Sequence, residues 1–387
     1  MTQSKDRAVD VVVVGGGVIG LAIAWRASER GLRTLVLDRG QAGGGTSRVA
    51  AGMLAPIAEV APAEEPLLEL GLASARAYPE FVSELSRASG RDDVGYLDCG
   101  TMLVARDRDE AEALDRELDL RRSFGLAVHR LLASEARSRE PALAPAVRLA
   151  LAIPDDHVID PRKLTMALAD ALSESAGELR ERADVAGLEV DGDRVSGVVL
   201  RGGERIRAPR VVLAAGAWCG AIEGIPAAAR VPVRPVKGQI LRLHDPAGSG
   251  LVARVLRFAA GYLVPRGDGR YVIGGTMEER GFDTTVTAGA MFELLREASE
   301  LVPGVSEFVL DELSAGLRPA TPDNLPAIGR GEPDGLYWAT GHRRSGILLA
   351  PITATLVADL LAGEQPPTLA APFDPARFAG ASIGSAA

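Results

Sequence analysis

The sequence predicts an α/β protein with two domains, one built on a parallel sheet and one on an antiparallel sheet. Near the start, four consecutive valines at 11–14 run into glycines and then into a helical stretch, which is typical of a parallel strand covered on both faces. Further along, the runs 239–243, 261–265 and 270–275 have the pattern of antiparallel strands, on which a helix over 288–301 would pack. We expect this second sheet to hold the substrate.

The first strand leads into a glycine motif. Residues 15–20 complete G-x-G-x-x-G, and a second strand over 34–37 ends in Asp38. Backbone N–H groups at the start of the following helix then point at a pyrophosphate, and the Asp38 carboxylate can accept hydrogen bonds from a ribose 2′-OH. The unit predicts a Rossmann-like dinucleotide-binding domain, with a glycine turn that binds nothing as the alternative. The residues expected at the phosphates are Gly15, Gly17, Val18, Ile19 and Gly20.

The composition is that of a globular protein with a small ligand. The chain has 387 residues, 47% hydrophobic and 25% charged, which is enough for two domains. A net charge of -9 argues against a nucleic-acid surface, because phosphate neutralisation needs clustered Lys and Arg. The uncharged stretch 11–25 is short for a membrane span, so we expect a cytoplasmic protein without one. Cys99 and Cys219 lack metal-ligand spacing, so we expect reduced thiols and no metal.

The segment 39–56, which follows Asp38, is rich in glycine and alanine. Small residues let the backbone approach a flat ligand, and Thr46 and Ser47 offer hydroxyl and N–H groups to phosphate. A flexible connection is the alternative, since loops of this composition are common.

The rest of the chain alternates helical and strand patterns. We expect helices over 66–87 (one or a pair), 108–124, 164–174 and 345–361 and one starting near 134, and strands over 96–104, 183–190, 194–200, 205–207, 211–218 and 336–341. Val185 would lie at the edge of an adenosine pocket. Pattern breaks predict a dinucleotide-binding domain of residues 1–90, 151–227 and 316–387, a substrate-binding domain of 91–150 and 228–315, and a disordered tail over 379–387.

Several further segments carry a family pattern. They are AAGMLAP (50–56), RPVKGQ (234–239), GYLVPR (261–266), GGTM (274–277), GLRP (316–319) and GHRRSGILLAP (341–351). Together with residues 15–20 and Asp38, these segments resemble the FAD-dependent D-amino acid oxidase family, most closely its glycine oxidase branch, the thiamine-pathway enzymes. The resemblance extends from Val11 to about Leu361.

The resemblance implies oxidative deamination of glycine and other small amino acids, such as sarcosine and small D-amino acids. A hydride would pass from Cα to flavin N5, O2 would reoxidise the flavin and give H2O2, and the imine would supply thiamine thiazole synthesis. The covalent flavin of sarcosine oxidases needs a cysteine near 316–319, and this sequence has none there, so noncovalent FAD is expected. Relatives form homo-oligomers, which implies one here.

The resemblance also assigns roles to single residues. Arg318 matches the carboxylate-binding arginine, whose planar guanidinium suits a carboxylate, with a structural ion pair as the alternative. Tyr262 matches a tyrosine that reaches the same carboxylate, although it could be a core residue. Arg344 matches a second active-site arginine, and Met277 would line the substrate wall or simply pack. The other residues assigned to FAD are Arg39, Thr46, Ser47, Ala51, Gly52, Met53, Val185, Gly216, His342, Arg343, Arg344, Ser345, Gly346, Ile347 and Leu348.

At the expected helix start, N–H groups of residues 345–347 would face the flavin pyrimidine edge and favour the reduced anion. Three departures from the family stand out: Asp38 replaces the more frequent Glu, Arg343 replaces an aromatic residue found in some relatives, and Cys219 replaces a hydroxyl residue common at this place. The alternatives are a D-amino acid dehydrogenase of the same fold with a different electron acceptor, an oxidase that prefers sarcosine or D-proline, a flavin-binding protein without turnover and, weakest, an NAD-dependent dehydrogenase.

Overall fold

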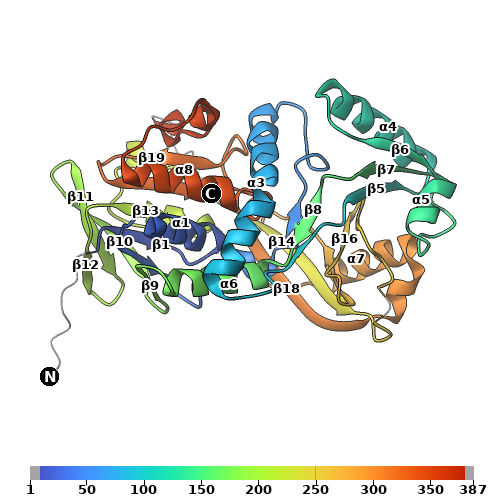
Figure 1. The fold of residues 1–387 in the computed structure, drawn as a ribbon, viewed down its shortest axis with the longest axis horizontal. Helices are drawn as coiled ribbons and strands as arrows, with labels where there is room; N and C mark the ends of the chain where they lie inside the picture. Colours follow the sequence, from blue (N-terminus) through green and yellow to red (C-terminus); the bar gives the residue numbers. More distant parts are fainter. Residues whose placement is uncertain (1–8, 249, 380–387) are drawn as a thin grey trace.

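The computed structural model describes residues 9–248 and 250–379, and its largest elements are two sheets with α3 (Glu65–Ser89) standing between them (Figure 1). The first sheet has six strands in the order β19-β20-β13-β1-β2-β9. Its parallel strands are β1 (Val11–Val14), β2 (Thr34–Leu37), β9 (Gly177–Arg180), β13 (Val211–Leu213) and β20 (Leu336–Thr340), and β19 (Ala327–Arg330) runs antiparallel at the edge. This is the Rossmann-like sheet that the valines and glycines predict.

The alternation of side chains along β1 divides the first domain into two cores. Val11 and Val13 pack into one cluster with α1 (Val18–Glu29), α6 (Pro161–Ser173) and α8 (Ala350–Ala362). Val12 and Val14 face the other way, into a cluster with the small antiparallel sheet of β10 (Val185–Asp191), β11 (Arg194–Leu200) and β12 (Arg205–Arg207). Because successive strand side chains point to opposite faces, four consecutive valines satisfy both cores.

The second sheet has eight strands in the order β18-β14-β17-β16-β15-β5-β7-β6. They are β18 (Val309–Ala320), β14 (Arg234–His244), β17 (Arg270–Gly274), β16 (Gly261–Pro265), β15 (Val255–Phe258), β5 (Thr101–Ala105), β7 (Leu149–Ile153) and β6 (His129–Leu132). Neighbouring strands run antiparallel except β15 and β5, which are parallel. α7 (Ala288–Leu301) packs on this sheet through Met291, Leu294 and Leu301.

Shorter elements complete the fold. A three-stranded sheet, in the order β3-β8-β4, is formed by β3 (Met53–Leu54), β8 (His157–Ile159) and β4 (Tyr96–Leu97). α4 (Arg108–Ser123) and α5 (Ala133–Arg139) lie beside β5, β6 and β7, at the far end of the molecule from β1 (Figure 1). Within residues 9–248 and 250–379, no helix combines the length and hydropathy that a membrane crossing requires.

Some sequence expectations differ from the structure. The strand expected over 96–104 is interrupted between β4 and β5, where Gly100 has a φ of 70°. The strand expected over 211–218 ends at Leu213 and is followed by a 3-10 helix, Gly216–Ala221. The helix expected over 345–361 begins only at Ala350, because residues 346–349 form turns and Pro351 takes a place in the first helical turn, where proline is favoured.

Two boundaries of the predicted domain division fall inside strands of the second sheet. The boundary at 150 falls inside β7, and residues 316–319, expected to return to the first domain, lie within β18 and pair with β14. Most of the predicted disordered tail, residues 380–387, lies outside the described residues.

Candidate active site

A cavity of about 780 Å³ extends from the carboxyl ends of β1, β2 and β13 to the surface of β14 and β18. Every residue that the sequence assigns to the site lines this cavity except Gly20. A Cβ atom built on Gly20 would lie 1.9 Å from the carbonyl oxygen of Gly15. The third glycine of the motif therefore lets α1 approach the turn closely and does not itself face the cavity.

The turn after β1 presents N–H groups to the cavity. Gly15 adopts a φ of 109° and donates its N–H to the Leu37 carbonyl, while the N–H groups of Gly17 and Ile19 have no acceptor among the described residues. The Val18 N–H donates to Ser47 Oγ at 3.0 Å, which leaves the hydroxyl hydrogen of Ser47 available. Unpaired N–H groups at a helix start suit a phosphate.

Thr46, the other predicted phosphate residue, uses its hydroxyl differently. Its Oγ1 donates to the Leu317 carbonyl at 2.8 Å. That bond ties the first turn of α2 (Thr46–Val49) to β18 of the second sheet.

Asp38 is fixed at the end of β2 by backbone donors. One carboxylate oxygen accepts from the Gly16 N–H and the other from the Gly40 N–H, both at 2.7 Å. Beside it the Arg39 guanidinium stacks 4.0 Å from the ring centre of Trp218, and both residues line the cavity. Val185 lines the same end. Sequence analysis did not assign Trp218 to the site, since its partner Arg39 is far away in the chain.

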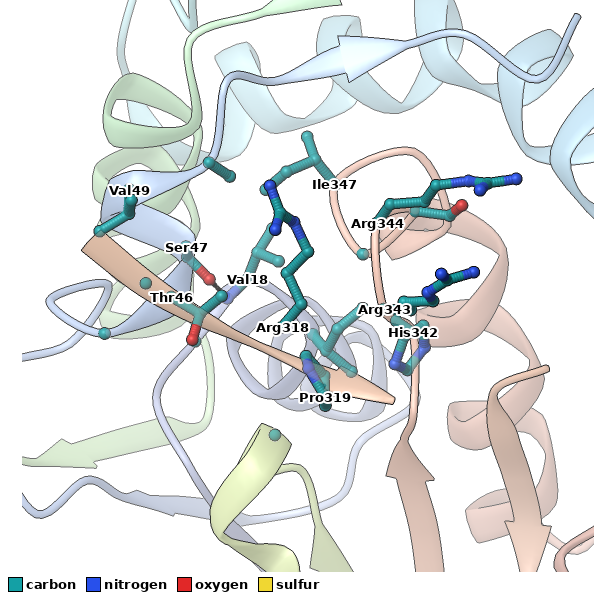
Figure 2. Close-up of a pocket in the computed structure, with 18 of the residues that line it drawn as sticks. Val18, Thr46, Ser47, Val49, Arg318, Pro319, His342, Arg343, Arg344 and Ile347 are labelled. Carbon is teal, nitrogen blue, oxygen red and sulfur yellow. Dashed lines mark hydrogen bonds between the residues drawn. The ribbon is translucent and has the colours of Figure 1, made fainter. Parts of the chain in front are cut away.

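The opposite end of the cavity is organised by Arg318 and Tyr262. A Cβ atom built on Gly275 would lie 2.7 Å from Tyr262 Oη and 3.1 Å from Arg318 Nη2, so the two polar tips converge beside bare backbone. Arg318 Nη1 donates to the Thr276 carbonyl at 2.9 Å, which fixes the guanidinium from one side. Figure 2 shows the Arg318 side chain rising from β18 into the space between Val18 and Ile347.

The Arg318 guanidinium has no carboxylate within salt-bridge distance among the described residues. A structural ion pair, the alternative raised by the sequence, therefore does not account for its position there. Burial raises the pKa of Tyr262, while the nearby Arg318 opposes this shift. The phenol accordingly stays protonated near neutral pH and can donate a hydrogen bond.

Arg344 and Arg343 also line the cavity but, unlike Arg318, both lie near acidic side chains. In Figure 2 both side chains extend to the side of their loop opposite Arg318. Arg344 donates to Glu64 Oε2 at 2.8 Å and approaches Glu59 Oε2 at 3.1 Å. Arg343, with a φ of 45°, reaches only to 3.8 Å of Glu64 Oε1, and burial together with Arg344 lowers its pKa. Sequence analysis did not single out Glu59 or Glu64.

The loop 342–349 offers further N–H groups. The Ile347 and Leu348 carbonyls accept from Tyr78 Oη at 2.5 Å and Ser74 Oγ at 2.6 Å, both on α3. The Ser345 N–H donates to the His342 carbonyl, so it is not available as expected, but those of Gly346, Ile347 and Leu348 have no acceptor in the described part of the chain. Because α8 starts at Ala350, its dipole begins several residues later than predicted.

His342 and Met277 have contrasting surroundings. Burial lowers the pKa of His342 to about 3, and Nε2 lies 3.1 Å from Thr353 Oγ1 on α8, so this imidazole is neutral at physiological pH. Met277 is 66% exposed and lies on the cavity wall. His342 therefore supports the loop, whereas Met277 borders the opening to solvent.

The cavity residues fit a dinucleotide with a flat ring system. Unpaired N–H groups, a fixed carboxylate and a stacked arginine line one end, small residues line the middle, and a guanidinium and a phenol converge at the other end. A parallel sheet with a dinucleotide-binding motif and an antiparallel sheet that share one cavity are typical of flavoprotein oxidoreductases. The family model described as FAD dependent oxidoreductase (DAO) matches residues 10–360, and the chain belongs to this family of FAD-using enzymes.

Similar proteins are glycine oxidases and related enzymes. The chain is 36% identical to a glycine oxidase from Geobacillus kaustophilus (strain HTA426), with 96% of this chain and 97% of that protein aligned. It is also 36% identical to the bifunctional protein ThiO/ThiG of Synechocystis sp. (strain ATCC 27184 / PCC 6803 / Kazusa), covering 95% of this chain and 54% of that protein. The crystal structure of the Geobacillus kaustophilus glycine oxidase superposes with a TM-score of 0.88 at 35% identity, over 97% of this chain and 99% of that one.

Proposed function

We propose that the enzyme oxidatively deaminates glycine and other small amino acids, including sarcosine and small D-amino acids, and supplies the glycine imine for thiamine thiazole synthesis. The convergence of Arg318 and Tyr262 beside Gly275 carries the proposal. A guanidinium without a protein carboxylate, next to a neutral phenol, suits the carboxylate of an amino acid. The glycine oxidase and ThiO/ThiG relatives support the choice of substrate and of pathway.

In this proposal the chain's residues bind and orient the reactants. Arg318 and Tyr262 hold the substrate carboxylate, so that Cα faces the ring system along the cavity. Bound FAD would supply the two-electron oxidation: it would accept the hydride from Cα at N5 and pass two electrons to O2, so that glycine and O2 would give the imine and H2O2. The substrate reacts with its amine neutral, and no carboxylate or histidine is needed as a general base. Met277 would line the substrate wall, and the ion pairs of Arg344 with Glu59 and Glu64 would fix another part of the cavity lining.

The cofactor is proposed to be noncovalent. The motif glycines, Val18 and Ile19, with Ser47 and the neighbouring loop, would hold the phosphates, and Asp38 the ribose. Residues 51–53 and 342–348 would face the ring system, with N–H groups that stabilise negative charge on reduction. A homo-oligomer, implied by the family resemblance, belongs to the same proposal.

Anaerobic mixing with glycine tests the proposal. The purified protein should be yellow, and glycine should bleach its absorbance near about 450 nm, where oxidised flavins absorb. Admission of O2 should restore the colour and release one H2O2 for each glycine consumed. Bleaching followed by slow return of colour would favour the dehydrogenase alternative. No bleaching by glycine, sarcosine or D-alanine would contradict the proposal.

A further inference from the structure

Two arginines of the second domain donate hydrogen bonds to backbone carbonyl groups of the segment 48–52, on the side of this segment away from the cavity. Arg242, on β14, donates from Nη2 to the Arg48 carbonyl at 2.7 Å. Arg266, directly after β16, donates from Nη2 to the Ala51 carbonyl at 2.7 Å and from Nη1 to the Ile159 carbonyl at 3.1 Å. Neither arginine lines the cavity, whereas Ala51 and Gly52 do.

For both guanidinium groups, the cost of burying the positive charge is poorly compensated by other interactions. Among the described residues, neither has a carboxylate within salt-bridge distance, and the Nε atom of each is buried without a hydrogen-bond partner. Burial lowers the pKa of each to about 10. A buried cation held only by carbonyl groups is costly for stability, because neutral acceptors compensate desolvation less well than a carboxylate. Such an arrangement suggests a role in function.

The direction of the Ala51–Gly52 peptide connects Arg266 to the cavity. In a planar trans peptide the C=O and N–H bonds point in opposite directions. Since the Ala51 carbonyl points to Arg266 behind the cavity wall, the Gly52 N–H points to the cavity side, and it has no acceptor among the described residues. Gly52 is locked in this position: its φ is 81°, and a Cβ atom would lie 1.9 Å from the Ile159 carbonyl oxygen.

We propose that Arg266, supported by Arg242, is a positioning residue that makes the Gly52 N–H a strengthened donor to the reduced, anionic flavin. A cation bonded to the carbonyl polarises the whole peptide and increases the positive charge on its N–H hydrogen. The inference rests on the proposed function, in which residues 51–53 face the ring system. It goes further by assigning part of the flavin's reduction potential to a side chain outside the cavity.

The test is the two-electron midpoint potential of the bound flavin in wild type, Arg266→Met and Arg266→Lys. The Met variant removes the charge and both hydrogen bonds, and we expect its potential to fall by about 30 mV, which equals a tenfold change in a two-electron equilibrium. The Lys variant keeps the charge and should recover at least half of the shift. Sulfite, which adds to oxidised flavin and leaves an anionic adduct, should bind the Met variant about tenfold more weakly.

Arg121→Met is the matched control. Arg121 is 1% exposed and also bonds backbone carbonyls, those of Ile57 at 3.0 Å and Ala58 at 2.8 Å, but neither residue lines the cavity. This variant should lower the melting temperature while the flavin potential stays at the wild-type value. A shift equal to that of Arg266→Met would attribute the effect to general destabilisation and overturn the inference.

Two outcomes separate this inference from the proposed function. The inference alone fails if wild type binds FAD and is bleached by glycine, but its flavin potential differs from that of Arg266→Met by less than about 9 mV. This difference corresponds to a twofold change in the two-electron equilibrium constant. If wild type is not bleached by any small amino acid, the proposed function fails, whatever the potentials are. Should Arg266→Met not fold, Arg266→Gln, which also removes the positive charge, decides together with Arg242→Met: unchanged potentials in both would overturn the inference.

Discussion

The Tyr262 hydroxyl and the Arg318 guanidinium meet beside Gly275 although β17 and β14 separate their strands, β16 and β18. Glycines in the two intervening strands make this possible. A Cβ atom built on Gly274 in β17 would lie 2.6 Å from Tyr262 Oη, and one on Gly238 in β14 would lie 2.2 Å from Arg318 Nη1. Each side chain thus passes over a glycine that has no Cβ atom to block it. As a result, the hydroxyl and the guanidinium lie close together in the cavity.

Replacement of Arg318 should weaken substrate binding without loss of the cofactor. Removal of one partner from a desolvated ion pair typically costs about 2–5 kcal/mol, so we expect the KM for glycine to rise at least about 30-fold in Arg318→Ala. The FAD content should equal that of wild type, because the guanidinium bonds the carbonyls of Thr276 and Lys237 and lies beside the Tyr262 hydroxyl, none of which belongs to the phosphate-binding turn after β1.

Steady-state kinetics with glycine and flavin absorbance per protein measure the two quantities. Arg234→Ala is the control, since Arg234 is on the same strand pair but pairs with Glu279 and does not line the cavity. Its KM should remain within a factor of two of wild type. Unchanged kinetics in Arg318→Ala would end the assignment of Arg318 to the substrate carboxylate.

Gly238→Ala should reproduce part of the Arg318 defect. The added methyl group would lie 2.2 Å from Nη1, so the guanidinium must move away from Tyr262. We expect the KM for glycine to rise about tenfold, or about 1.4 kcal/mol, with FAD retained. Gly289→Ala in α7, where nothing lies within 4 Å of the new Cβ, should leave the KM unchanged. Equal KM values for the two variants would show that Arg318 tolerates displacement.

The parts of the site predicted from sequence are those carried by local motifs. Residues 15–20 and Asp38 could be placed at one cavity because a strand, a glycine turn and a helix fix their geometry within a short segment. Arg318 and Tyr262 were found through the family resemblance, since nothing local distinguishes an arginine in a strand that binds a ligand from one that pairs on the surface.

Other features depend on long-range packing and gave no local signal. Glu59 and Glu64 form ion pairs with Arg344, although roughly three quarters of the chain length separates them from it in the sequence. Only the fold brings these residues together. Similarly, Gly238 and Gly274 are ordinary strand glycines until the sheet order shows which side chains cross them. The start of α8 was misplaced because an apolar pattern continues through the turns at 346–349, and the proline at 351 was a better signal.

Acid precipitation should release the flavin. Covalent attachment needs a nucleophilic side chain at the ring system, and no residue that lines the cavity is a cysteine. The imidazole of His342 is engaged with Thr353. We expect all yellow colour in the supernatant after denaturation in trichloroacetic acid and none in the pellet. Colour that stays with the pellet, together with a protein mass increased by that of FAD, would contradict noncovalent binding.

The stability of the protein should depend on pH through Asp156. This carboxyl group is fully buried and accepts from the Ile57 N–H at 3.2 Å and the Ala58 N–H at 2.5 Å, directly before Glu59. Burial raises its pKa to about 7 despite these bonds. Since the folded-state pKa exceeds the unfolded value of 3.8, the folded protein holds a proton that the unfolded chain has lost between pH 4 and 7. Asp156 therefore contributes less stability as pH rises through this window.

Comparison with Asp156→Asn isolates this contribution. The amide keeps the shape and cannot ionise, so the free energy of unfolding of the variant minus that of wild type should increase from pH 5 to pH 7, by at most about 1.4 kcal/mol per pH unit. Urea unfolding at pH 5, 6, 7 and 8 measures the difference, and other titrating groups such as His342 cancel because both proteins contain them. Above pH 7 the difference should level off, since Asp156 is then ionised in both states. A difference that stays constant from pH 5 to 8 would mean that Asp156 is already ionised in the folded protein at pH 5, with the two N–H donors outweighing its burial.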